Sequence, residues 1–102
     1  MELKRNCWNG CKGNWVREKK PLDDLTEYVR ATYDEHYSHD GIQAIDLIIA
    51  SGRGIDFCLG NIIKYATRIG HKPGEDRKQT ALKIAHYSLL LLDSLENEHG
   101  ER

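Results

Sequence analysis

A group of polar side chains at helical spacing is the part of this sequence best suited to chemistry. Asn61, Lys64, Tyr65 and Arg68 stand at offsets of zero, three, four and seven, so in a helix they share one face. That face offers an amide, a phenol and two cations, which are the donors and charges that phosphate oxygens require. We expect the two cations to hold phosphates, and Asn61 and Tyr65 to orient a ribose or a base. The alternative interpretation is a solvated face, which every amphipathic helix has.

A second, smaller polar set follows closely in the chain. Lys83 and Tyr87 are four residues apart, and His86 adjoins them. If the two helices pack antiparallel across the Pro73–Gly74 turn, both sets converge on one cleft, and Lys83 would neutralise charge that develops there. The alternative is an exposed lysine beside a half-buried aromatic residue.

The segment from Asp34 to Gly41 is polar and is predicted to be a loop. Within it His36, Tyr37 and His39 supply groups that bind phosphate or transfer a proton, although such a segment also suits turns. Cys7 and Cys11 together with the two histidines would be acceptable zinc ligands. The histidines are separated by only two residues, however, and no other metal motif is present. We therefore expect no metal site and interpret the cysteines as reduced thiols.

Hydrophobic periodicity predicts an all-α fold, a small bundle of about four helices. The expected helices span residues 21–33, 42–52, 55–69 and 77–96, and residues 21–102 form one helical nucleotide-binding domain. Residues 1–20 show no period and are expected to be an irregular N-terminal arm. Pro21 suits the first turn of a helix. The residues of the third helix expected to face the core are Ile55, Leu59, Ile62, Ile63, Ala66 and Ile69.

The last helix carries apolar residues on two faces. One stripe runs through Leu82, Ala85, Leu89 and Leu92, and a second through Ala81, Ile84, Leu91 and Leu95. One face would pack inside the subunit and the other against a partner. A chain of 102 residues buries only about two-thirds of its unfolded surface. We therefore expect a homo-oligomer with its site at or near the subunit interface.

Charge and composition exclude several classes of function. Fifteen basic and sixteen acidic residues give a net charge of −1, which argues against general nucleic-acid binding. No apolar run is long enough to span a membrane, and no secretory signal is recognised, so a cytoplasmic location is expected. Three cysteines fit a reducing compartment. There is no GxxxxGK[ST] loop, no GxGxxG after a strand and no GxSxG motif.

Three segments carry a family resemblance over about residues 34 to 95. They are EHYSHDGIQAIDLI, FCLGNIIKYATRIGHK and LKIAHYSLLLLDSL. Together they resemble the small phage proteins known as SaV-like nucleotide kinases. The family pattern is a His-Tyr, a Gly-Ile-Glu with a later Asp, a Gly-Asn-x-x-Lys-Tyr-x-x-Arg helix and a closing Lys-x-x-x-Tyr helix. The matching positions are His36, Tyr37, Gly41, Ile42, Asp46, Gly60, Asn61, Lys64, Tyr65, Arg68, Lys83 and Tyr87.

The resemblance implies a nucleoside monophosphate kinase that lacks a P-loop and acts in an infected bacterial host. Asp46 and Lys83 would be its catalytic residues, with Asp46 holding Mg²⁺ or accepting a proton. Two acids of the pattern are replaced, however, by Gln43 and Thr80. Carboxylates are the natural ligands of Mg²⁺, so these changes weaken an enzymatic interpretation more than a binding one, although Asp46 and Asp76 remain.

Three functions therefore stand open at this point. The chain binds phosphorylated nucleotides and transfers phosphate with Mg²⁺, or it binds them without chemistry. In the second case it would be a sponge that sequesters a nucleotide signal of host defence and needs no cofactor. In the third case it inhibits a host enzyme through its apolar last helix and its tryptophan-bearing arm.

Overall fold

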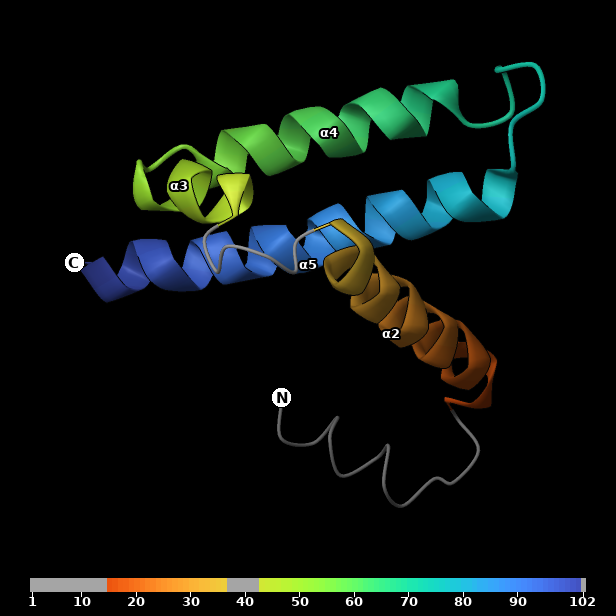
Figure 1. Cartoon of the computed structure of the whole chain (residues 1–102), viewed down its shortest axis with the longest axis horizontal. Coiled ribbons are helices and arrows are strands. Elements are labelled where there is room, and N and C mark those ends of the chain that lie inside the picture. Colours follow the sequence, from red (N-terminus) through yellow and green to blue (C-terminus); the bar gives the residue numbers. More distant parts are fainter. Residues whose placement is uncertain (1–14, 37–42, 102) are drawn as a thin grey trace.

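The computed structural model describes residues 15–36 and 43–101, with side chains placed for residues 15–34 and 43–97. Every regular element in this part of the chain is a helix, which confirms the expected all-α bundle (Figure 1). The helices are α2 (Val16–His36), α3 (Ala44–Ala50), α4 (Gly54–Arg68) and α5 (Arg77–Glu101). None of these described helices is long and apolar enough to cross a membrane. Residues 1–14, most of the expected arm, lie outside the described residues.

Helix α2 begins earlier than its proline suggested. The expected start was Pro21, but the helix begins at Val16 and includes Pro21. The backbone N–H of Glu18 donates to the Trp15 carbonyl at 3.0 Å and so closes the first turn. Pro21 has no N–H of its own, so it leaves the Arg17 carbonyl without the usual helical donor, which is tolerable at an exposed helix start. Residues 16–20 are therefore helical and not part of an irregular arm.

Local capping sets the ends of the shorter elements. The Gln43 N–H donates to Asp46 Oδ2 at 2.9 Å, which satisfies a donor ahead of α3. The Ser51 hydroxyl donates to the Ile48 carbonyl at 2.8 Å, and Gly52 then takes a φ of +85°, a left-handed conformation that suits glycine. The chain therefore turns sharply into α4.

Helices α4 and α5 form an antiparallel hairpin (Figure 1). Gly70 and Gly74, in the turn between them, have φ values of +85° and +75°. Glu75 accepts the Gly70 N–H at 2.7 Å, and Asp76 caps α5 by accepting the N–H groups of Lys78 and Gln79 at 3.0 and 3.3 Å. The turn is thus fixed by two carboxylates that hydrogen-bond the backbone.

Small residues hold the other end of the hairpin together. Cys58 is fully buried, and Ser94 of α5 is 5% exposed. A Cβ on Gly54 would overlap the Ser94 hydroxyl and approach the Ile49 side chain to 3.0 Å, so the absence of a side chain lets α4 lie close to α5 and α3.

The expected core face of α4 was partly wrong. Leu59 and Ile63 are 42% and 61% exposed, and Ala66 is exposed too. The face turned toward α5 instead contains the small residues Gly54 and Cys58, because they permit the closest approach.

Candidate functional site

Three cations surround the ring of Tyr65, which is half-buried near the C-terminal end of α4. Lys64 Nζ lies 4.9 Å from the ring centroid, Arg68 Cζ 5.3 Å and Lys83 Nζ 5.2 Å. These distances are within the range of cation–π attraction. Lys64 and Arg68 come from α4, and Lys83 comes from α5. The structure thus places together the two polar sets that the sequence put on separate helices.

The three cations have no acidic partner in the part of the chain that the structure describes. The ion pairs there join Lys20 and Lys78 to Asp24, and Arg30 to Glu27. Three like charges around one ring repel one another, and that repulsion is relieved when an anion binds among them. The arrangement is therefore suited to a group that carries several negative charges.

Beside the cations lies a cavity of about 210 Å³ with aromatic walls. Tyr65 and Tyr87 stack at 6.2 Å with an angle of 16° between their planes, and Phe57 meets Tyr87 at 6.0 Å in an edge-on contact. Lys83 also lines the cavity. The remaining wall residues come from α2, α3 and α5 and are Tyr28, Thr32, Tyr33, Ala44, Ile45, Ile48, His86 and Leu90.

His86 joins α2 to this wall. Its ring meets Tyr28 at 5.8 Å and Tyr33 at 6.0 Å, both in edge-on geometry. Burial lowers the pKa of His86, because the charged imidazole would lose hydration there. Its Nε2 atom is buried and has no hydrogen-bond partner among the described residues. The imidazole is therefore held in its neutral form at the junction of α2 and α5.

Two other residues of the predicted site, Asn61 and Asp46, form hydrogen bonds within or next to their own helices. The Asn61 amide nitrogen donates to the Phe57 carbonyl at 2.9 Å, within its own helix. Asp46 is exposed and caps α3 through its bond to the Gln43 N–H, and it does not line the cavity. His36 ends α2, but its side chain is not described, and Tyr37 lies outside the described residues.

Thr80, the other position where an acid was expected, is only 7% exposed. Its side chain and the Gly70 N–H lower the pKa of Glu75. Its hydroxyl donates to the Asp76 carbonyl at 3.4 Å. Asp76 itself caps α5. The residues at this end of the hairpin thus stabilise the turn.

The predicted site did not include Tyr28, Tyr33 and Phe57, which line the cavity. Four of the five tyrosines of the chain line the cavity. Because the chain has few other aromatic residues, a search for the place where its tyrosines gather could have found them. Sequence spacing within one helix does not show which faces of different helices meet.

The hypothetical zinc ligands are not placed. Cys7, Cys11 and His39 lie outside the described residues, and the His36 side chain is not described. Among the described side chains, no three His, Cys, Asp or Glu residues gather in a way that would hold a metal ion.

The model of one protein family, a protein of unknown function (DUF3310), matches residues 31–88, more than half of the chain. The matched range includes all three cations around Tyr65. No curated protein and no solved structure matches. The expected membership of the SaV-like nucleotide kinases is therefore wrong, because the family found has no known function and nothing in the match points to a phage nucleotide kinase.

Proposed function

Because the chain belongs to the DUF3310 family, whose function is unknown, we propose a function from its own site: it binds a phosphorylated nucleotide. The observation that carries this proposal is the ring of Tyr65, with three cations at 4.9 to 5.3 Å and an aromatic cavity beside it. Lys64, Arg68 and Lys83 would hold the phosphates. Arg68 supplies a planar fork of donors, and the lysines supply point charges.

The cavity supports the second half of the proposal, recognition of a base. Its walls offer the faces and edges of Tyr65, Tyr87 and Phe57, on which a flat heterocycle stacks. Its volume of about 210 Å³ is below the 300–1,000 Å³ of a typical small-molecule pocket. A base fits such a space better than a whole nucleotide does. The phosphates would then remain outside the cavity, near the three cations around the Tyr65 ring, of which Lys83 lines the cavity.

Binding without chemical change is favoured over catalysis by the composition of the wall. No carboxylate belongs to the described wall of the cavity, and Asp46 is occupied in capping α3. Phosphoryl transfer needs groups that hold Mg²⁺ and position the nucleophile. A protein that sequesters a nucleotide in the cytoplasm needs only the cations and the rings.

Thermal-shift and calorimetric titrations with adenosine and guanosine mono-, di- and triphosphates test this proposal. A nucleotide at about a hundred times its dissociation constant adds about 2.7 kcal/mol of stability. We expect Arg68→Ala and Lys83→Met each to weaken binding at least about tenfold, because each removes a charge-assisted hydrogen bond. Lys72→Met, an equal change of charge in the exposed turn, is the control and leaves affinity unchanged.

Two results would contradict the proposal. One is the absence of any shift with every nucleotide in the panel. The other is equal affinity in Arg68→Ala, Lys83→Met and the Lys72→Met control. Incubation of each nucleoside monophosphate with ATP as phosphoryl donor and Mg²⁺, followed by anion-exchange chromatography, separates binding from catalysis. Recovery of unchanged nucleotide is expected, and any conversion would show an enzyme.

A further inference from the structure

A strip of apolar side chains runs along the junction of α2 and α5, away from the Tyr65 cavity. Leu22 is 50% exposed, and Leu89 and Leu92 of α5 are 43% and 63% exposed. Among the hydrophobic residues that the structure describes, only Cys58 is fully buried. Leucines of this kind usually form the core of a domain. The subunit therefore leaves much of its apolar surface without cover.

The strip has both a ridge and recesses. Leu22 and Leu25 line two adjoining hollows of about 420 and 390 Å³. On the α5 side, Ala81, Leu82 and Ala85 line the first hollow, and Leu89 lines the second. Because Leu22 and Leu25 line both hollows, these two side chains stand between the hollows as a ridge on α2. A ridge and a hollow therefore adjoin on the same surface, as a twofold contact between two copies requires.

The charges around the hollows favour a partner of the same kind. Two acidic residues, Glu18 and Asp24, and two basic residues, Lys78 and Arg30, line them, so their charges sum to zero. A nucleic acid or an anionic membrane would require a basic excess at this place. Since the charged residues around the hollows sum to zero, two copies of this surface can approach each other without net electrostatic repulsion. A twofold axis also places each patch against its own equivalent, which suits a surface with ridge and hollow together.

We propose that a second copy of this chain docks here, with the Leu22–Leu25 ridge of each protomer seated in a hollow of the other. The resulting dimer, by itself or within a larger symmetric assembly, covers α2 on the side that α5 leaves open. This inference does not depend on nucleotide binding. It assigns the partner face to α2 and α5 and leaves the exposed α4 residues outside the contact.

Sedimentation velocity and light scattering on the full chain test the proposal. Leu22→Glu would place a charge in an apolar contact and is expected to weaken association at least about hundredfold, as is Leu89→Glu. Ile63→Glu on α4 is the matched control, because Ile63 is 61% exposed and lies outside both hollows. The expected result is at least a twofold loss of mass in both leucine variants and the wild-type mass in Ile63→Glu.

Circular dichroism shows whether each variant keeps its helices. Leu22 and Leu89 are both partly exposed in the subunit, and they come from different helices, so one variant remains informative if the other unfolds. The proposal is overturned if the wild-type protein is a monomer throughout the micromolar range. A monomer is also the result expected if residues 1–14 of the same chain, and not a second copy, cover the strip. The proposal is equally overturned if folded Leu22→Glu and Leu89→Glu keep the wild-type mass, or if Ile63→Glu loses mass as they do.

Discussion

The α4/α5 hairpin and helix α2 are built in different ways. The hairpin is fixed at one end by Gly54, Cys58 and Ser94, which let the two helices approach closely, and at the other end by carboxylates that bind the turn. Helix α2 instead crosses α5 obliquely and projects away from the hairpin (Figure 1). Its contacts with α5 include the rings around His86 and an ion pair at Asp24.

This difference separates the two halves of the candidate site. All three cations and Tyr65 belong to the hairpin, so the part of the site that we propose to bind phosphate rests on the tightly packed unit. Tyr28 and Tyr33 belong to α2, so one wall of the cavity depends on a helix with weaker attachment. Elements with few buried contacts open locally at low free energy. A change in the hairpin should therefore affect the whole protein, whereas a change in α2 should affect mainly the cavity wall.

The largest effect on the free energy of unfolding is expected from Gly54→Ala, in the hairpin. The new Cβ would overlap the Ser94 hydroxyl and approach Ile49, so the helices must move apart. Overpacking of this kind costs about 1–3 kcal/mol. Urea denaturation followed by circular dichroism measures the free energy of unfolding.

Gly60→Ala in the same helix is the matched control. A Cβ there would meet nothing within 4 Å, so the substitution is expected to stabilise α4 by about 0.5–1 kcal/mol. The two variants thus have opposite signs although the chemical change is identical. Equal effects would show that helix propensity, and not close packing at Ser94, decides the stability of the hairpin.

Much of this fold could be predicted from the sequence, because its boundaries are local. Gly52, Gly70 and the Pro73–Gly74 turn mark helix ends through backbone conformation, and the structure has helices ending at these places. The start of α2 was predicted wrongly, because Pro21 favours a first turn without requiring it. The core face of α4 was also predicted partly wrongly. Periodicity counts Leu59 and Ile63 as apolar, but it does not show that Gly54 lets the helices approach closely on another face.

The candidate site could be predicted only in part, for a related reason. Lys64, Tyr65 and Arg68 share one helix, so their proximity follows from spacing. Lys83 reaches the Tyr65 ring only because α4 and α5 pack antiparallel. The short turn between the two helices suggested this packing, and the structure contains it. Tyr28 and Tyr33 could not be assigned, because the crossing of α2 over α5 depends on tertiary contacts that no local pattern records.

A smaller effect on the free energy of unfolding is expected when the pH is lowered, and it arises where α2 contacts His86 of α5. The folded pKa of His86 is lowered by burial, so the unfolded chain takes up the proton first. The contribution of His86 to stability is thus full above its unfolded pKa of about 6.5 and is lost as the pH falls from there through the lower folded pKa. The free energy of unfolding, measured between pH 7.5 and 5.5, should decrease in part for this reason.

His86→Phe isolates this contribution, because it keeps a ring between Tyr28 and Tyr33 and removes the titrating group. We expect a weaker pH dependence in this variant than in the wild type. His71→Asn is the control, since His71 is exposed in the turn of the hairpin, and it should keep the wild-type dependence. Identical pH profiles for His86→Phe and the wild type would mean that the histidine does not report on the α2 junction.

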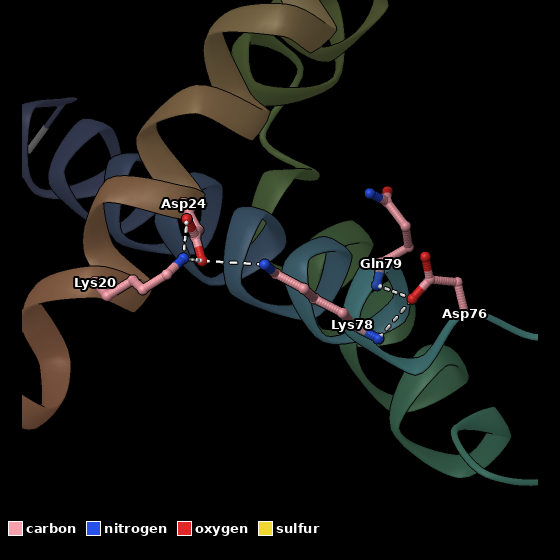
Figure 2. A network of polar contacts seen from close by, with 5 residues as sticks. All are labelled: Lys20, Asp24, Asp76, Lys78 and Gln79. Carbon is pink, nitrogen blue, oxygen red and sulfur yellow. Dashed lines mark hydrogen bonds and ion pairs between the residues drawn. The ribbon is translucent and has the colours of Figure 1, made fainter.

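The smallest effect is expected from the ion pair at the outer end of the same junction. Asp24 accepts hydrogen bonds from Lys20 at 3.1 and 3.0 Å and forms an ion pair with Lys78 of α5 at 3.1 Å (Figure 2). The side chains of the two lysines are 77% and 64% exposed, so solvent and salt screen the attraction. Asp24→Asn should therefore lower the Tm by at most about 3 °C, and 1 M NaCl should remove much of that difference.

Glu27→Gln is the matched control for this last change, because Glu27 pairs with Arg30 at 3.6 Å within α2 and makes no bridge to α5. The lysines lower the pKa of Asp24, first through the hydrogen bond of Lys20 and then through that of Lys78. The pair therefore stabilises the fold above the ordinary carboxylate pKa of about 3.8, and the effect is lost as the pH falls through the lower folded value. If Asp24→Asn and Glu27→Gln lower the Tm equally at neutral pH, the bridge adds nothing to the attachment of α2. The rings around His86 would then be the contact on which the α2 wall of the cavity depends.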